Sequence, residues 1–233
     1  MWLADLTWPE VAERAATGAL LAVPMGSTEQ HGPHLPLSTD ADIAVLLCER
    51  LAAELPGVLI APPVCYGSSG EHAGFAGTLS IGQDATELLA LELGRSAGET
   101  FSRLLFVSGH GGNAEPLRRA VLKLRAESRD VALFQPDWAN ADAHAGREET
   151  AMLLAVRPGI VRMELSAPGE RRPLAELMPL LRAEGVRAVS PSGVLGDPTT
   201  ATAVAGAQLL EELGSALVTY VEAWQSRLSG APR

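Results

Sequence analysis

Short apolar runs alternate along this chain with longer stretches in which apolar residues recur at every third or fourth position. The runs have the length of buried strands and lie at 20–24, 58–62, 103–108 and 131–135. The helical periodicity covers 41–55, 84–100, 114–128, 148–155 and 199–226. Apolar runs separated by helical stretches are typical of a parallel sheet with helices on its faces. The pattern therefore predicts an α/β fold with a central, mostly parallel sheet.

Polar residues mark the ends of several predicted elements. Asp40 and Asp84 precede two of the helical stretches and are predicted to be their N-caps. The segment 158–188 follows no single periodicity and is compatible with helix or loop. The 233 residues are 47% hydrophobic and contain no internal repeat or linker, so we expect one domain over 1–233.

Histidines gather in the segments that follow the predicted strands. Right-handed crossovers bring the carboxyl ends of parallel strands to one edge of the sheet, where ligands bind in such folds. All five histidines lie in four such segments; they are His31, His34, His72, His110 and His144. We therefore expect a functional site at this edge.

The segment after the first strand, STEQHGPHLPLSTD, holds two histidines and two acids. Glu29 and His31 are two positions apart, so on extended backbone they point to the same side and can approach one ion together. Asp40 follows a stretch stiffened by prolines and stands at the start of a helix. Its carboxylate either caps that helix or bridges two metal ions.

The segment GHGGN at 109–113 follows the third strand and opens a helix. Its glycines let the backbone turn sharply and admit a ligand closely. The spacing differs from the G-x-G-x-x-G pattern of dinucleotide-binding turns, which argues against a nucleotide there. We interpret His110 as a metal ligand, the alternative being a histidine that packs in the turn.

The segment after the fourth strand contains His144 and two adjacent acids, Glu148 and Glu149. Positions five apart on a helix point about 140° apart, so His144 and Glu149 can converge only if the helix begins near Gly146. His144 then lies in the loop, free for proton transfer, and Glu149 faces the ion from the first turn. Glu148 would be its solvated neighbour, and the reverse assignment of the two acids stays open.

Histidines and carboxylates without cysteine suit a solvent-open catalytic site for Zn²⁺, Fe²⁺ or Mn²⁺. The candidate ligands exceed what one ion uses, so we expect two divalent ions; the ligands are Glu29, His31, Asp40, His110 and Glu149. Such ions polarise a substrate carbonyl and lower the pKa of water toward neutrality. The sequence thus favours metal-dependent hydrolysis, with His144 as the catalytic residue that transfers protons.

The glycine-rich segment 67–77 lies after the second strand. GSSGE differs from the G-x-S-x-G motif of serine hydrolases because Glu71 stands at the last glycine. We interpret the loop from Tyr66 to Gly77 as a mobile substrate wall, with Glu71 and His72 as substrate contacts; the alternative is a surface loop with incidental polar groups. Trp138, after the fourth strand, either contacts substrate or covers the core.

Charge and cysteine content exclude several partners. The formal net charge is −10 and no basic run interrupts it, which disfavours nucleic acid and anionic membranes. Cys48 and Cys65 have no neighbouring cysteine and are expected to be reduced thiols. The chain has neither a secretion signal nor an apolar run of the roughly 20 residues that span a bilayer, so we expect a cytoplasmic protein.

Four motifs together resemble the creatininase family of metal-dependent amidohydrolases. They are GSTEQHGPHLPLSTD, YGSSGEHAGFAGTLSIG, SGHGGN and HAGREET, and the resemblance runs over 3–222. It implies a three-layer creatininase-like fold with a dinuclear centre. In the family, the equivalents of Glu29, His31, Asp40 and His110 are similar to metal ligands, with the aspartate bridging, and the equivalent of His144 is similar to a catalytic histidine.

One position departs from the family pattern. Creatinine-hydrolysing members have a glutamate two residues after the histidine that matches His110, where this chain has Gly112. The second ion then needs another carboxylate, for which Glu149 is the candidate. The different ligand set argues against creatinine as the substrate.

Within the family, MWLADLTWPEV, FVSGHGGN, DAHAGREET and GVLGDPTTAT most resemble the members encoded with the mycofactocin pathway. The resemblance implies a homo-oligomeric peptidase that removes the C-terminal Val and Tyr from a radical-modified precursor peptide, in redox-cofactor biosynthesis. Two alternatives stay open. One is an amidohydrolase of this family acting on a small cyclic amide or a formamide, and the other is a non-catalytic peptide-binding scaffold in cofactor maturation.

Overall fold

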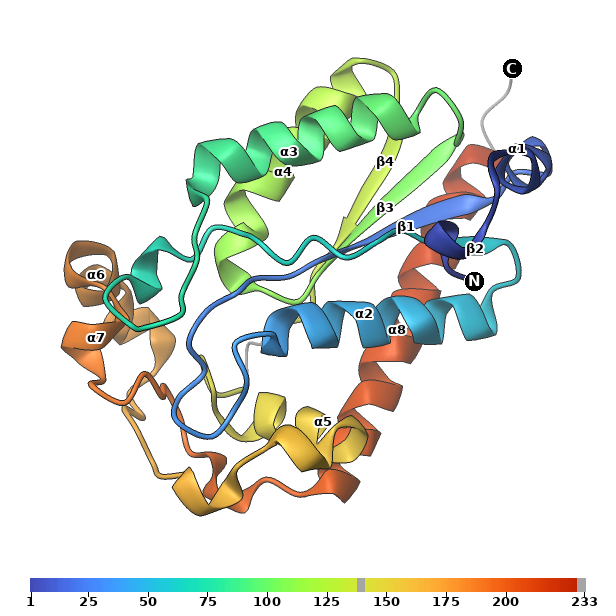
Figure 1. Ribbon diagram of the computed structural model, residues 1–233. Helices are drawn as coiled ribbons and strands as arrows, with labels where there is room; N and C mark the ends of the chain where they lie inside the picture. The colour runs from blue at the N-terminus through green and yellow to red at the C-terminus, as the bar shows by residue number, and fades with distance from the viewer. Residues whose placement is uncertain (138–140, 230–233) are drawn as a thin grey trace.

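The computed structural model describes residues 1–137 and 141–229 and places a parallel sheet between two layers of helices (Figure 1). The strand order is β2-β1-β3-β4. The strands are β1 (Leu20–Met25), β2 (Val58–Ile60), β3 (Arg103–Ser108) and β4 (Asp130–Phe134). The predicted α/β fold is confirmed, and each strand end lies within two residues of its predicted position.

The α-helices of the described residues cover both faces and one end of the sheet. They are α1 (Trp8–Ala16), α2 (Thr39–Glu54), α3 (Gly82–Ala97), α4 (Ala114–Ala126), α5 (Arg147–Val156), α6 (Leu174–Glu184), α7 (Val186–Val189) and α8 (Ala203–Ser229). None of these helices is long and apolar enough to cross a membrane. Helices α6 and α7 occupy the later part of the segment 158–188, which has no clear periodicity.

Two predicted N-caps are wrong. Helix α2 begins at Thr39 with Ser38 at the N-cap position, and Asp40 lies inside the first turn. Helix α3 begins at Gly82, so Asp84 also lies in the first turn. Both helices start earlier than the apolar periodicity does, because the first turn of each is polar or small. The displacement frees the side chain of Asp40 for another role.

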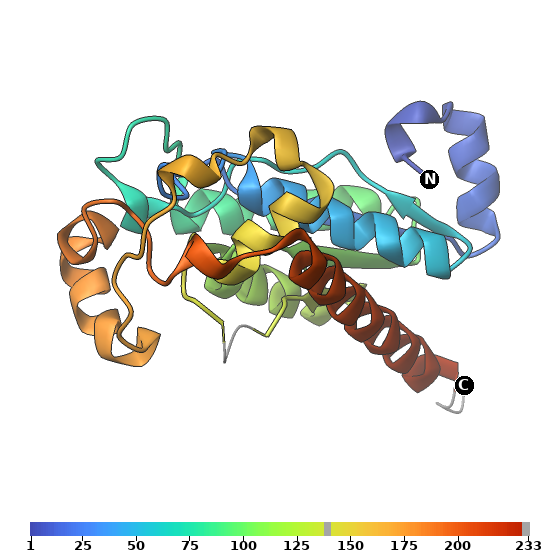
Figure 2. The same ribbon diagram turned by 90° about the horizontal axis from the view of Figure 1, so that it is seen from below.

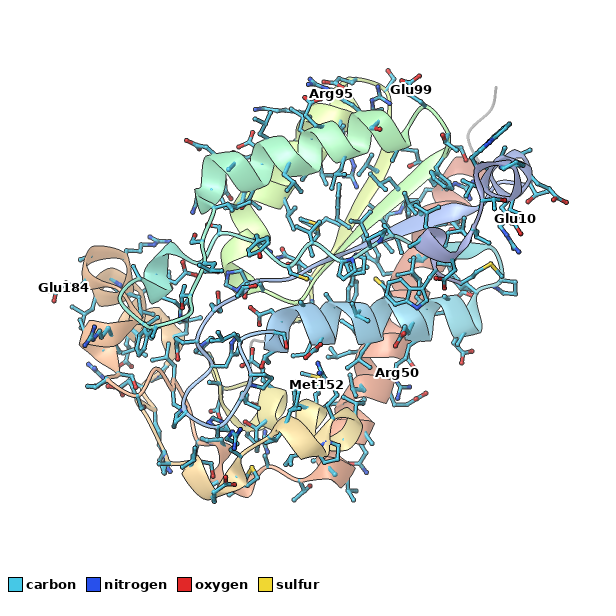
Figure 3. All side chains as sticks on the ribbon, in the orientation of Figure 1. Glu10, Arg50, Arg95, Glu99, Met152 and Glu184 are labelled. Carbon is cyan, nitrogen blue, oxygen red and sulfur yellow. The ribbon has the colours of Figure 1, made fainter. Side chains whose placement is uncertain are left out.

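Alternate residues of each strand face opposite helical layers. Leu20 and Ala22 pack with α2, α5 and α8, whereas Leu21 and Val23 pack with α3 and α4. Met152 of α5 is fully buried in the first of these cores, between α5 and α2 (Figure 3). Because both faces are covered, the strands are apolar except at their ends, where Arg103, Ser108 and Asp130 stand.

The carboxyl ends of β1 and β3 form the functional edge of the sheet. These strands pair in parallel from Leu20↔Arg103 to Met25↔Ser108, and β2 lies on the other side of β1. The chain therefore reverses its direction of winding beside β1, which is where open α/β sheets bind ligands. Figures 1 and 2 show this edge facing α6 and α7, at the opposite end of the molecule from α1.

Candidate metal centre

Six titratable side chains are buried together at the carboxyl ends of the strands. They are Glu29, His31, Asp40, His72, His110 and His144, each 7% exposed or less. They come from the segments after all four strands, as the crossover rule predicts. Burying charged groups is costly unless each is paired or binds a cation, so their contacts decide what the cluster does.

Glycines at the ends of two strands let the first turn of α2 enter the cluster. A Cβ on Gly26 would lie 2.3 Å from Ala41 Cα, and a Cβ on Gly109 would lie 2.2 Å from the main-chain oxygen of Asp40. Any side chain at these positions would push α2 away from the sheet. The two glycines therefore bring Asp40 between β1 and β3.

Asp40 lies between two histidines, with one carboxylate oxygen toward each. Oδ1 is 3.0 Å from Nε2 of His31, and Oδ2 is 3.0 Å from Nδ1 of His110. Ser27 Oγ donates a hydrogen bond of 2.7 Å to Oδ2. Asp40 thus faces both histidines instead of capping α2, and its role as a bridge between two ions stays a prediction.

Glu29 is fully buried, and neither carboxylate oxygen has a hydrogen-bond partner among the described residues. His72 Nε2 lies 3.3 Å from Oε1, His110 Nε2 lies 3.3 Å from Oε2, and His144 Nδ1 lies 3.7 Å from Oε1. Burial raises the pKa of Glu29 to about 8. A buried carboxylate without hydrogen bonds, ringed by imidazoles, is the environment expected where a cation binds.

Protons on two histidines balance the charge of this cluster. Burial acts to lower the pKa of His31 and His110, but the carboxylates of Asp40 and Glu29 outweigh it and raise both pKa values to about 10. The same two histidines hold the pKa of Asp40 well below its usual range, against the effect of burial. A divalent cation would replace these protons on the same ligand atoms, so the residues fit a metal centre.

Within the described part of the chain, three overlapping groups of side chains bring candidate ligand atoms within 4.8 Å of one another. They are Glu29–His31–Asp40, His31–His144–Glu149 and Glu29–His72–His144. The predicted ligands Glu29, His31, Asp40 and Glu149 fall in these groups, and His110 reaches the cluster through its contacts with Asp40 and Glu29. The structure brings all five together, and their roles as ligands stay predictions.

The two adjacent acids of α5 have different surroundings. Helix α5 has Gly146 at its N-cap position, as predicted, and Glu149 Oε2 accepts 2.6 Å from the N–H of Ala145 and lies 3.9 Å from His31 Nε2. Burial raises the pKa of Glu149 to about 7. The prediction that Glu148 is solvated is wrong: it is 6% exposed, because Arg147 and the N–H of Asp142 bond its carboxylate. Glu149 is the acid that faces the cluster.

At Gly112, the segment after β2 packs closely against the main chain beside the cluster. A Cβ at this position would lie 2.2 Å from the main-chain oxygen of Ser68, 2.5 Å from His110 Nε2 and 2.6 Å from Glu71 Oε1. The segment after β2 therefore occupies the space that a side chain at 112 would need. Glu71 is partly exposed, with Oε1 4.0 Å from His110 Nε2.

The predicted substrate contacts lie in three different settings. Glu71 lines the cavity in front of the cluster. His72 is buried beside Glu29 instead of standing on an outer wall, and burial lowers its pKa to about 3. Trp138 lies outside the described residues. Substrate contact stays a prediction for all three.

His144 is placed by a distant segment. It forms an antiparallel bridge with Leu195, whose main-chain oxygen accepts from the N–H of His144 at 3.2 Å and whose N–H donates to the oxygen of His144 at 2.8 Å. His144 therefore lies in the loop before α5, as predicted. Burial and the neighbouring His31 hold its pKa well below the usual range, so its imidazole is neutral at physiological pH.

A cavity of about 1290 Å³ opens in front of the cluster. Glu29, Asp40, His110 and His144 lie on its inner wall. Another part of its wall comes from α6, the residue before it and the start of α7. It is mainly apolar but includes two charged residues; the lining residues there are Pro173, Leu174, Ala175, Met178, Leu181, Arg182, Ala183, Glu184, Gly185 and Val186. The space is large enough for several residues of an extended peptide.

Two buried amide side chains belong to the cluster although the sequence analysis did not select them. Asn113 Oδ1 accepts from the N–H of Ser68 and its Nδ2 donates to the oxygen of Gly26, which ties the segment after β2 to the end of β1. Gln30 contacts His72 and His144. Gln30 and Asn113 both lie within the motifs that hold predicted metal ligands, and this position is the one sign in the sequence that they belong to the site. Neither can bind a divalent ion as histidine does, so ligand chemistry alone does not identify them.

Known proteins of one family resemble this chain in sequence and in fold. The sequence matches the creatininase family model, described as creatinine amidohydrolase, over residues 4–221. A mycofactocin precursor peptide peptidase of Mycobacterium ulcerans is 49% identical, with 94% of this chain and 86% of that protein covered. A protein of the same name from Mycolicibacterium smegmatis is 48% identical, with 91% and 87% covered.

A solved structure titled creatininase Mn has a TM-score of 0.82 with 23% sequence identity, and the match covers 95% of this chain and 97% of that chain. At this identity the likeness concerns the fold, and it confirms the predicted three-layer creatininase-like architecture.

Proposed function

This chain belongs to the creatininase family, and from that premise we propose that it is a metal-dependent peptidase that cleaves a mycofactocin precursor peptide near its C-terminus. The bond cleaved would release the fragment derived from the terminal Val and Tyr. As a member of this amidohydrolase family the chain is a hydrolase of amide bonds. The peptide substrate is drawn from relatives that are nearly half identical over most of the chain.

The observation that carries the proposal is the buried carboxylate of Glu29, which has no hydrogen-bond partner among the described residues and opens on a peptide-sized cavity. Glu29, Asp40 and Glu149, with His31 and His110, would hold two divalent ions. Bound there, the ions would polarise the scissile carbonyl and lower the pKa of a water molecule. Zn²⁺, Fe²⁺ and Mn²⁺ all suit this donor set.

The remaining residues act on protons and on the substrate. His144 Nδ1 lies 3.7 Å from Glu29 Oε1, and burial lowers the pKa of His144 so that its imidazole is neutral. The free Nδ1 could then take up a proton and pass it to the leaving amine. The apolar wall of α6 and α7 would exclude water and hold apolar side chains of the peptide. Glu71, at the cavity wall, would contact the peptide backbone.

The decisive assay incubates the modified precursor peptide with protein loaded with Zn²⁺, Fe²⁺ or Mn²⁺ and follows the products by mass spectrometry. We expect a Val-Tyr fragment only with metal-loaded protein, and none with chelator or with the Glu29→Gln variant. Hydrolysis of a small cyclic amide or a formamide, with the peptide intact, would instead support an amidohydrolase that acts on small molecules. Peptide binding without hydrolysis under any metal would support a scaffold.

A further inference from the structure

Gln30 is a buried amide whose orientation is set by two main-chain groups. Its Oε1 accepts from the N–H of Gly32 at 2.8 Å, and its Nε2 lies 3.3 Å from the carbonyl oxygen of Gly193. A main-chain N–H only donates and a carbonyl oxygen only accepts, so the amide cannot be turned over without losing both bonds. Gly193 permits this approach, because a Cβ there would lie 1.8 Å from Oε1.

This orientation determines which nitrogen of His72 carries the proton. Gln30 Nε2 lies 2.8 Å from His72 Nδ1 and can only donate, so Nδ1 must be the acceptor. In a neutral imidazole the other nitrogen then carries hydrogen. That nitrogen, Nε2, lies 3.3 Å from Glu29 Oε1. A protonated ring nitrogen has no lone pair for a metal ion.

The main-chain oxygen of Gln30 sets the opposite state in His144. It lies 2.7 Å from His144 Nε2, which must therefore donate. The amide nitrogen of Gln30 also lies 3.0 Å from His144 Nε2, but an amide nitrogen accepts no hydrogen bond, so the main-chain oxygen is the acceptor that His144 Nε2 meets. His144 Nδ1 thus keeps its lone pair and turns it toward Glu29, 3.7 Å away.

His72 differs from the two predicted histidine ligands in which ring nitrogen carries the proton. His31 Nδ1 lies 3.1 Å from the main-chain oxygen of Glu29, and His110 Nε2 lies 2.8 Å from that of Ser68, so both of these nitrogens donate. The opposite nitrogens, His31 Nε2 and His110 Nδ1, face Asp40 and are available to a cation. His72 has no corresponding free nitrogen facing the cluster, because its unprotonated Nδ1 accepts from Gln30.

We propose that Gln30 is a positioning residue of the metal centre. Its side-chain amide fixes the proton of His72 on Nε2 and so keeps that nitrogen from binding metal, although His72 lies in one of the three ligand groups. Its main-chain oxygen leaves the lone pair of His144 Nδ1 free for proton transfer. The inference rests on the proposed metal-dependent function and adds the proton positions on which that function depends.

The test is the protonation of each ring nitrogen in the Zn²⁺-loaded protein, measured by long-range ¹⁵N–¹H correlation with histidine labelled in the ring. Zn²⁺ is diamagnetic, and the nitrogen shift separates a protonated, an unprotonated and a metal-bound nitrogen. In the unmodified protein we expect His72 to be protonated at Nε2 and not bound to Zn²⁺. In Gln30→Glu the introduced carboxylate can only accept, so the proton of His72 moves to Nδ1.

Two internal controls accompany this variant. His144 should keep its proton on Nε2 in Gln30→Glu, because a main-chain oxygen holds it there. Gln83→Glu makes the same substitution at the exposed wall of the same cavity and should leave every histidine unchanged. With Zn²⁺ per chain unaltered, Gln30→Glu should lower turnover on the order of 10–100-fold, the usual effect of losing a partner of the ligand sphere.

Binding of Zn²⁺ to His72 Nε2 in the unmodified protein, or a proton on its Nδ1, would overturn the proposal. If Gln30→Glu does not fold, Gln30→Met removes the amide without adding charge and should leave His72 in a mixture of its two tautomers; a single unchanged tautomer would contradict the proposal. His72→Gln replaces the imidazole N–H by an amide N–H, and this variant should bind as much Zn²⁺ per chain as the unmodified protein. The spectra need no peptide, so their outcome is separate from the identity of the substrate.

Discussion

His31 and Asp40 are nine residues apart in the sequence and face each other with 3.0 Å between Nε2 and Oδ1, both almost completely buried. The contact exists because Gly26 and Gly109 let the first turn of α2 reach the ends of β1 and β3. Without a metal ion, a proton lies between the imidazole and the carboxylate. A cation that binds there must displace it, and this exchange gives the first prediction.

Metal affinity should depend steeply on pH. His31 and His110 have pKa values of about 10 in the metal-free protein, above the pKa of about 8 of Glu29. Between these values the histidines are protonated and must lose their protons to bind metal, so affinity rises with pH and falls as pH drops. Each proton released contributes about tenfold per pH unit. Competition against a chromophoric chelator, corrected for the chelator's own protonation, measures the slope; a flat profile would contradict it.

Replacing His144 by alanine should separate chemistry from metal binding. Proton transfer by a positioned side chain contributes typically about 10²–10⁴-fold, so His144→Ala should lower kcat by that order while keeping its metal. Glu29→Gln, which alters a buried ligand candidate, should lose metal as well as activity. The two variants are compared by measuring the metal bound per chain and the steady-state kinetics on the same samples. Loss of metal from His144→Ala would give His144 a ligand role instead.

Adding a single methyl group at Gly112 should disturb the cluster. The new Cβ would lie 2.2 Å from the main-chain oxygen of Ser68, which accepts from His110 Nε2 at 2.8 Å. The segment after β2 must move, so we expect Gly112→Ala to lose activity on the order of 10–100-fold through the displaced histidine. Gly111→Ala is the matched control, because nothing lies within 4 Å of its Cβ. Equal activities of the two variants would argue against this packing.

Close contact of α8 with α5 should be required for stability. A Cβ at Gly206 of α8 would lie 1.8 Å from the main-chain oxygen of Ala151 of α5. We expect Gly206→Ala to lower the free energy of unfolding by about 1–3 kcal/mol, as overpacking of a tight core does. Gly214→Ala on the same helix meets only the flexible side chain of Arg50, at 3.1 Å, and should be neutral or stabilising. Chemical denaturation measures both, and a stable Gly206→Ala would refute the close approach.

The sequence predicts the sheet and the location of the site because both follow from local rules. Apolar runs locate the strands, and the crossover rule then gathers Glu29, His31, Asp40 and His110 at one edge without knowledge of any contact. The start of α5 was also predictable, since only a helix that begins near Gly146 lets Glu149 approach His144.

Long-range contacts account for what the sequence does not predict. Glu148 is buried because Arg147 and the N–H of Asp142 enclose it, and its position in the first turn of a helix does not reveal this. His72 lies in a segment without periodicity, and its place depends on Gln30 and, through it, on Gly193. The cavity wall of α6 and α7 likewise forms only when residues 174–189 pack across from the strand ends.

The metal content of Asp40→Asn, measured by elemental mass spectrometry beside its peptide hydrolysis, tests the central claim most directly. Asp40 faces His31 with one oxygen and His110 with the other, so removal of its charge should affect both ions at once. We predict two divalent ions per chain in the unmodified protein, neither ion held stoichiometrically in Asp40→Asn, and no hydrolysis by the variant. A folded Asp40→Asn protein that keeps two ions and cleaves the peptide at the normal rate would contradict the account.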